Sequence, residues 1–178
     1  MSSAAGAGAA GAGAEGAVTV RAARREDVPH VHRMIQELAA YEGVPDGPKL
    51  SVEDLLEDGF DAPSPWYFLL VAERGGTLVG YALCNRAYSS WTRRAFYVED
   101  IYVPPEHRRA GVGAKLFKEI CRLGVREGVH RVDWHVLESN APALAFYARL
   151  GARDMRASEG RAALRLDRHR IEYVADNY

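Results

Sequence analysis

The feature that most constrains the fold is a glycine-containing junction between an apolar strand and an amphipathic helix. The strand expected at 95–103 ends at two prolines, and an R-x-x-G-x-G pattern then leads into a helix expected at 111–127. Glycines allow a tight turn and let the backbone approach an anion without an intervening Cβ. The following helix adds unpaired N–H groups and the positive end of its dipole. The junction therefore predicts a cradle for a diphosphate group at the end of a central strand.

Two familiar diphosphate motifs do not fit this junction. A Walker loop needs Gly-Lys followed by Ser or Thr, which is absent. A dinucleotide fingerprint needs a third glycine, but the third position after Gly113 is Leu116. A glycine turn that merely starts a helix remains the structural alternative.

The rest of the chain predicts strands mixed with helices. Short apolar segments are bounded by Gly and Pro, and longer segments repeat apolar residues at three- and four-residue spacing. We expect strands at 18–20, 67–73, 78–85, 95–103, 132–137 and 162–167, and helices at 26–41, 51–59, 111–127 and 140–150. This order indicates an α/β (α+β) sheet domain.

The N-terminal segment differs in composition from the rest of the chain. Thirteen of residues 1–17 are Ala or Gly. Glycine interrupts helices, and this segment offers nothing large to bury, so we expect a disordered tail. The remaining residues, 18–178, have a length that suits one domain.

Composition excludes several classes of protein. The chain carries 23 basic and 24 acidic residues, which argues against a nucleic-acid partner. No apolar run approaches the ~18–20 residues that span a membrane, and no signal peptide is visible. Cys84 and Cys121 form no CxxC pair, so we expect no disulfide scaffold. The histidines do not have the spacing of a metal-binding site, so we expect no metal. Two free thiols favour a cytoplasmic protein.

Charge is placed unevenly along the chain. Residues 36–61 hold eight acids and one base, whereas residues 86–131 hold ten Lys or Arg and five acids. Each run taken alone is typical of a solvated face. Together they favour a protein that binds an anion on one side and a cation on the other.

A second motif follows the glycine junction about thirty residues later. It runs from Asn140 through Phe146-Tyr147 to Gly151-Ala152. The two motifs in this order resemble those of the GCN5-related N-acetyltransferase (GNAT) superfamily. Further segments at 37–42, 54–60, 88–91, 99–103 and 158–160 look like the diamine acetyltransferase family, and the resemblance as a whole covers essentially residues 18–167. Segments 88–91 and 99–103 look closer to its thialysine branch than to its spermidine/spermine branch.

This resemblance implies a GNAT fold, in which helices flank a mixed central sheet and splayed strands hold acetyl-CoA. It also implies a homodimer. The cofactor-binding residues that it implies are Ile101, Tyr102, Val103, Arg108, Arg109, Ala110, Gly111, Val112, Gly113, Ala114, Asn140, Ala141, Pro142 and Ala143.

Acetyl transfer to an amine requires proton movement. An alkylamine has a pKa near ~10.4, so the site must remove a proton before the nitrogen can attack a thioester. The resemblance implies Tyr147 as the general acid and, less firmly, Glu99 as the base. The alternatives are a tyrosine packed on Phe146 and a carboxylate paired with an arginine. Because successive residues of a strand point to opposite faces, we expect Asp100 on the face opposite Glu99, so that the two cannot both line one site.

The resemblance also implies residues for a small cationic amine acceptor. They are Tyr41, Glu42, Ser89, Asp133, Trp134, His135 and Glu159. Ser139 and Arg161 stand where the family usually has aromatic residues, which puts polyamine specificity in question. An acetyltransferase of protein N-termini or lysines, and a non-catalytic acyl-CoA-binding module, are the alternative functions.

Overall fold

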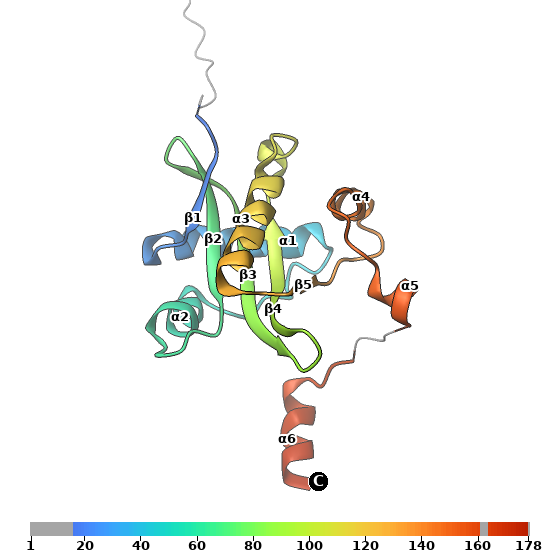
Figure 1. Cartoon of the computed structure of the whole chain (residues 1–178). Coiled ribbons are helices and arrows are strands. Elements are labelled where there is room, and N and C mark those ends of the chain that lie inside the picture. Colours follow the sequence, from blue (N-terminus) through green and yellow to red (C-terminus); the bar gives the residue numbers. More distant parts are fainter. Residues whose placement is uncertain (1–15, 161–163, 178) are drawn as a thin grey trace, which may run out of the picture. The chain divides into compact units, whose positions relative to one another are not determined.

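The computed structural model describes residues 16–160 and 164–177 (Figure 1). The chain divides into two compact units, the first ending at His135 and the second beginning at Val136. Each unit is described by itself below. Most of the tail expected at 1–17 lies outside the described residues, and Gly16 and Ala17 have no regular secondary structure.

The first unit is built on a five-stranded mixed sheet. The strands lie in chain order, and the first four are antiparallel to their neighbours, while the last is parallel to β4. The strands are β1 (Thr19–Ala22), β2 (Phe68–Arg74), β3 (Thr77–Ser89), β4 (Arg93–Tyr102) and β5 (Arg131–Trp134). A parallel pair needs a crossover, which α3 (Val112–Glu127) supplies between β4 and β5. The predicted mixed sheet is therefore confirmed.

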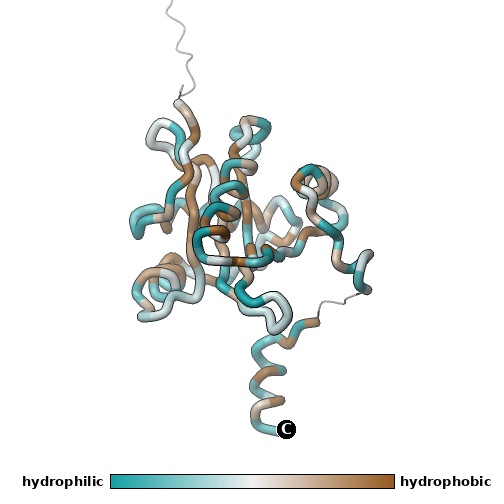
Figure 2. Tube along the Cα trace, viewed as in Figure 1, coloured by the Kyte–Doolittle hydropathy of each residue, from teal (hydrophilic) through white to brown (hydrophobic). Residues whose placement is uncertain are grey.

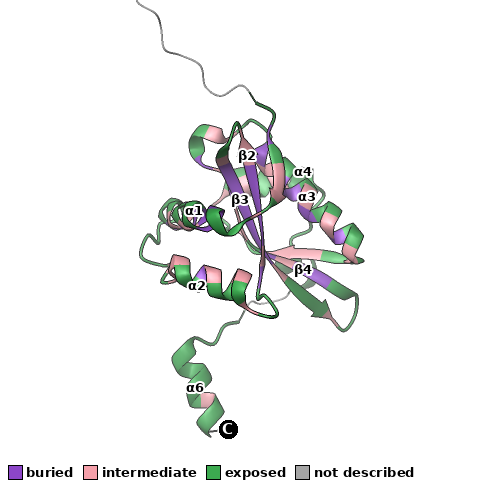
Figure 3. Ribbon diagram, turned by 90° about the vertical axis from the view of Figure 1, so that its left-hand side faces the viewer, coloured by how far each residue is buried: buried purple, intermediate pink, exposed green. Residues whose placement is uncertain are grey.

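Helices cover both faces of this sheet. In Figure 3, α1 (Val28–Tyr41) and α3 lie on opposite sides of β2 and β3. The other helices of the unit are η1 (Arg25–Asp27), α2 (Val52–Leu56), η2 (Glu57–Asp61) and η3 (Pro105–His107). Val28, Val31 and Ile35 recur on one face of α1 and are buried, as their spacing predicts.

Two hydrophobic clusters fill the two layers. One lies between α1 and the sheet and includes Tyr81 and Leu83. The other lies between α3 and the sheet and includes Phe96 and Val98. Figure 2 shows hydrophobic colour along the central strands. Both faces of β3 and β4 are covered. The cluster that contains a buried side chain of these strands therefore shows which face of the sheet that side chain occupies.

The second unit holds three helices. They are α4 (Ala141–Arg149), α5 (Met155–Glu159) and α6 (Arg168–Asn177). The Asn140 side chain accepts a hydrogen bond from the Ala143 backbone N–H at 3.3 Å, so the predicted helix cap is present. Neither α5 nor α6 was expected from the sequence.

The strand expected at 162–167 is wrong for the residues that can be checked. Residues 164–167 have no strand, and 162–163 lie outside the described residues. Leu164 is 94% exposed. Alternating leucines favour a strand, but a strand needs a neighbour to satisfy its backbone, and the five strands described do not include this segment. No helix in the described part of the chain is long and apolar enough to cross a membrane.

Candidate active site

Strands β4 and β5 separate part-way along their length. Their pairing runs from Ala95 opposite Arg131 to Val98 opposite Trp134. Strand β5 then ends, whereas β4 continues to Tyr102. On this edge, residues 99–102 have no strand partner among the described residues, although β3 still pairs with the other edge. Exposed backbone N–H and C=O groups on a strand edge can hold an extended ligand.

A bulge lies at the point where the strands separate. Leu83 pairs with Asp100, but the next residue of β3, Cys84, pairs with Val98, so Glu99 is an extra residue on β4. Val98 and Ile101 therefore both pack on the α3 side although they are three positions apart. Bulges interrupt alternation and redirect side chains, and they are frequent beside active sites.

The bulge corrects the placement of Asp100. Asp100 lies beside Leu83 and accepts a hydrogen bond from Tyr81, and both partners belong to the α1-side cluster. Strict alternation, which set Asp100 on the opposite face from Glu99, does not apply across the inserted residue. Both carboxylates therefore have to be considered at the same end of β4.

The glycine junction forms the turn into α3. Gly111 is the N-cap and has a φ of 74°, in the left-handed region that favours glycine. No side chain caps this helix among the described residues. A Cβ at Gly113 would meet only the Val103 side chain, at 4.0 Å. The first N–H groups of α3 are therefore free of a capping side chain, which suits an anion.

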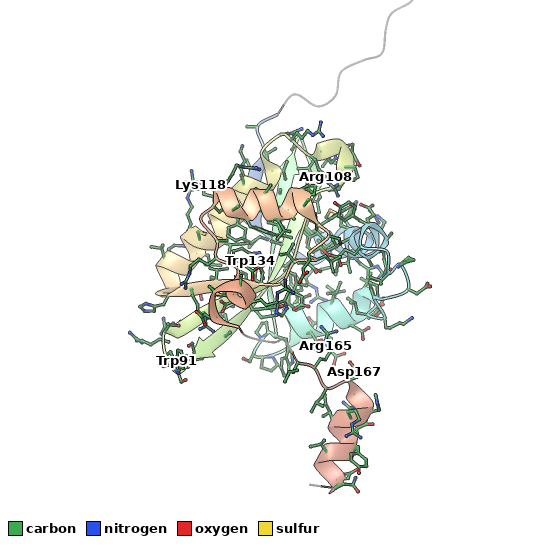
Figure 4. The ribbon with its side chains drawn as sticks, turned by 90° about the vertical axis from the view of Figure 1, so that its right-hand side faces the viewer. Trp91, Arg108, Lys118, Trp134, Arg165 and Asp167 are labelled. Atoms are coloured by element: carbon green, nitrogen blue, oxygen red, sulfur yellow. The ribbon has the colours of Figure 1, made fainter. Side chains whose placement is uncertain are left out.

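The two arginines of the junction have different surroundings. Arg108 is half-buried, its Nε donates to the Val103 carbonyl at 2.8 Å, and its guanidinium lies 4.6 Å from the ring centre of Tyr41. Arg109 is exposed and has a φ of 61°. Figure 4 labels Arg108 before α3 and Trp134 at the end of β5. Arg108 thus ties the loop to β4 and α1, while Arg109 is available for a ligand.

Asp100 has a perturbed ionisation. Tyr81 Oη donates to Asp100 Oδ2 at 3.0 Å, and Tyr81 is fully buried. Burial raises the pKa of Asp100 to about 6, the Tyr81 hydrogen bond opposes this rise, and the negative charges of Glu99 and Glu42 add to it. Glu42 follows directly after α1, so the acidic groups come from two elements.

Comparison with known proteins identifies the family. Residues 31–152 match the model of the acetyltransferase (GNAT) family. The chain belongs to this family.

Individual relatives agree with this assignment. The chain is 38% identical to thialysine N-epsilon-acetyltransferase of Sus scrofa over 166 residues, which are 89% of this chain and 97% of that protein. It is 31% identical to the human spermidine/spermine N(1)-acetyltransferase-like protein 1, over 85% of this chain and 23% of that protein. A solved aminoglycoside N-acetyltransferase in complex with CoA has a TM-score of 0.67 at 18% identity, covering 86% of this chain and 97% of that one.

As a GNAT acetyltransferase, the chain uses acetyl-CoA as its donor. The geometry fits this group on two counts. Beyond Val98 one edge of β4 is free, and the chain then runs through η3 to the uncapped turn at Gly111. An extended arm can pair with the strand while a diphosphate meets the N-terminus of α3.

Two expected acceptor residues of the acetyltransferase are engaged elsewhere in the first unit. Ser89 Oγ accepts hydrogen bonds from the backbone N–H groups of Trp91 and Thr92, each at 3.2 Å. Arg131 binds both residues, with Nη1 at 3.3 Å from Ser89 Oγ and Nε at 2.7 Å from Asp133 Oδ2. Ser89 is six residues beyond Leu83, or about 20 Å along a strand, so the structure does not bring it to Asp100.

Two further expected acceptor residues, Trp134 and His135, contact aromatic side chains of the first unit. Trp134 packs edge-on against Phe117, with ring centres 5.1 Å apart. His135 Nδ1 lies 2.7 Å from Tyr97 Oη. These contacts position the end of β5 next to the separating strands.

The remaining predicted residues lie in the second unit. Tyr147 is half-buried on α4, and its ring centre is 5.3 Å from that of Phe146. Glu159 is the last residue of α5. The roles expected for these two residues stay predictions.

Sequence reasoning did not select Asp100 or Tyr81. No sequence pattern marks a bulge, because a bulge is defined by register against a neighbouring strand. The only signal available was the adjacency of two acids at 99–100 in an otherwise apolar strand.

Proposed function

We propose that this acetyltransferase transfers the acetyl group of acetyl-CoA to a primary amine of a small cationic acceptor, of the diamine, polyamine or thialysine type. The observation that carries the proposal is the acidic end of β4 beside the cofactor edge. Glu99 and Asp100 lie where β4 separates from β5. The negative charge of Glu42, which follows α1, raises the pKa of Asp100. Negative charge at the reacting end attracts and orients an ammonium group.

The donor would be held by three segments. Backbone groups of Ile101, Tyr102 and Val103 would bind the pantetheine arm, residues 109–114 would hold the diphosphate, and residues 140–143 would add contacts from the second unit. Acetyl-CoA supplies the activated thioester when bound. The free edge and the uncapped helix support the first two assignments.

For the chemistry, we propose that Glu99 accepts the proton of the reacting ammonium. The neutral amine forms the C–N bond, the C–S bond breaks, and its electron pair leaves with sulfur. Tyr147 would donate a proton to that thiolate. The nitrogen loses a second proton after the C–N bond has formed, and this proton returns to the tyrosine. One proton is therefore released overall.

The relatives favour an acceptor of the thialysine type. The pig relative carries that name over most of its length, and the human spermidine/spermine-like relative is less similar. Tyr41, Trp134, His135 and Glu159 remain proposed acceptor contacts. Ser89 and Asp133, which share Arg131, would contribute through that network. We also propose a cytoplasmic location, in keeping with two free cysteines. We further propose a homodimer, as the family resemblance implies.

The test is thiol release from acetyl-CoA across a panel of acceptors. The panel holds thialysine, lysine, spermidine, spermine, putrescine and a lysine-containing peptide. We expect turnover with the small amines, fastest with thialysine. Turnover with the peptide alone would contradict the proposal and support a protein acetyltransferase. Tight acetyl-CoA binding with no turnover of any amine would also contradict it.

A further inference from the structure

Buried and half-buried carboxylates of the first unit are paired with arginines. Asp27 and Glu73 both bind Arg21, and Glu127 binds Arg86. Pairing is expected, because an ionised carboxylate removed from water is costly unless a countercharge faces it.

Asp100 departs from this pattern. Among the described residues, no Lys, Arg or His lies within ion-pair distance of its carboxylate, and Oδ1 has no hydrogen-bond partner. Tyr81 from β3 binds Oδ2, Cys84 lies on the same strand, and Glu99 and Glu42 face it with negative charge. The groups around Asp100 are thus neutral or acidic.

Asp100 lies on the part of β4 from which a cationic ligand could approach its carboxylate. Its backbone belongs to the stretch of β4 that leaves β5, one residue beyond the bulge. The same stretch is the cofactor edge of this acetyltransferase. A cationic group that reaches Asp100 therefore also reaches the donor end of the strand.

We propose that Asp100, held by the Tyr81 hydroxyl, is the residue that binds the acceptor's ammonium group. This proposal rests on the proposed function. A charge-assisted N–H···O bond to Oδ1 would supply the countercharge that the protein does not provide. Tyr81 positions the carboxylate by occupying its other oxygen. Asp100 thereby determines acceptor affinity, while Glu99 and Tyr147 move protons.

The proposal makes acceptor binding depend on pH. Only ionised Asp100 attracts an ammonium, and its pKa is raised to about 6 by burial and by Glu99 and Glu42. kcat/KM for the amine should therefore fall as pH drops through about 6. The Tyr81 hydrogen bond favours the ionised form, so its removal in Tyr81→Phe should move this acidic limb to higher pH.

The experiment compares Asp100→Asn with wild type, using whichever of thialysine, lysine and spermidine the wild type acetylates fastest. We expect a rise in amine KM of roughly ten- to a hundredfold, since a hydrogen bond to a charged group is lost. kcat at saturating amine should change much less, and acetyl-CoA affinity should stay constant in a calorimetric titration. The matched control is Asp61→Asn, which removes an exposed carboxylate paired with Arg25 and should leave both constants unchanged.

Each outcome has a distinct meaning. An unchanged amine KM in Asp100→Asn, with an active wild type, overturns the role of Asp100 and leaves the proposed function standing. A wild type that acetylates no amine overturns both. A KM rise without any shift of the acidic limb in Tyr81→Phe contradicts the positioning role of Tyr81.

Discussion

Asp27 and Asp100 are both carboxylates removed from water in the first unit, yet their surroundings are opposite. Asp27 is 7% exposed and accepts hydrogen bonds from Arg21 Nη1 at 2.6 Å, Arg21 Nη2 at 3.1 Å and the Arg24 backbone at 2.7 Å. The Arg21 guanidinium lowers the pKa of Asp27. Burial raises the pKa of Asp100, which has a tyrosine hydroxyl in place of a cation.

The difference separates a fold-stabilising carboxylate from a ligand-binding one. Asp27 joins β1 to the start of α1 through a complete ion pair, so its charge is used within the protein. Asp100 is left without a cationic partner among the described residues, beside the free edge of β4. Sites that bind charged ligands often retain such unfavourable arrangements at the expense of stability.

The largest effect is expected for Tyr147→Phe. In contrast to the fold-stabilising Asp27 and the ligand-binding Asp100, Tyr147 is proposed to donate a proton. Loss of a general acid should lower kcat about a hundredfold or more. Acetyl-CoA affinity and amine KM should change little, which is the reverse of Asp100→Asn. Steady-state kinetics together with a calorimetric titration measure both quantities. Unchanged kcat would remove Tyr147 from the acid role.

Asp27→Asn should destabilise the fold without altering the acceptor site. Loss of hydrogen bonds to a charged partner should lower the free energy of unfolding by about 2 kcal/mol. Urea unfolding measures this loss, and amine KM is the control. A large rise in KM with unchanged stability would make Asp27 a ligand-binding residue and break the comparison.

Stability should respond to pH with opposite signs at the two residues. The lowered pKa of Asp27 contributes stability that is present above the unfolded pKa of ~3.9 and lost as pH falls through the folded value. The raised pKa of Asp100 contributes stability at low pH that is lost as pH rises toward about 6. Asp100→Asn should therefore unfold at the same or a higher temperature than wild type at pH 7. A clearly lower melting temperature would show that Asp100 serves the fold.

A smaller effect is expected at the exposed arginine of the glycine junction. Arg109→Ala should weaken acetyl-CoA binding by about tenfold, since one charged contact to a diphosphate is lost. Amine KM and the free energy of unfolding should stay constant. Arg122→Ala, on the exposed face of α3, is a matched control. Equal acetyl-CoA affinity in Arg109→Ala and wild type would contradict the cradle assignment.

The sequence predicted those parts of the site that depend on local chemistry. Gly111 and the helix after it were predictable because a left-handed turn and a helix start are encoded within a few residues. Asn140 was predictable as a helix cap for the same reason. The acetyl-CoA donor followed from two motifs in order, although neither was decisive alone.

The parts of the structure that the sequence did not show depend on partners distant in sequence. The role of Asp100 follows from the register of β4 against β3, which places an extra residue at Glu99. The engagement of Ser89 and Asp133 follows from Arg131, which lies 42 residues from Ser89. The strand expected at 162–167 has alternating leucines but no neighbour in the described sheet. Alternation alone therefore indicates that a segment can form a strand, not that it does.

The most direct test of the account is an NMR titration of the Asp100 carboxyl, using carbon-13-labelled protein with CoA bound, with and without the acceptor amine. Without amine, we expect a pKa near 6, well above that of an ordinary aspartate. With saturating amine, the pKa should fall by about one unit or more, because an ammonium beside the carboxylate favours its ionised form. An Asp100 pKa that the amine leaves unchanged would show that the acceptor's charge binds elsewhere.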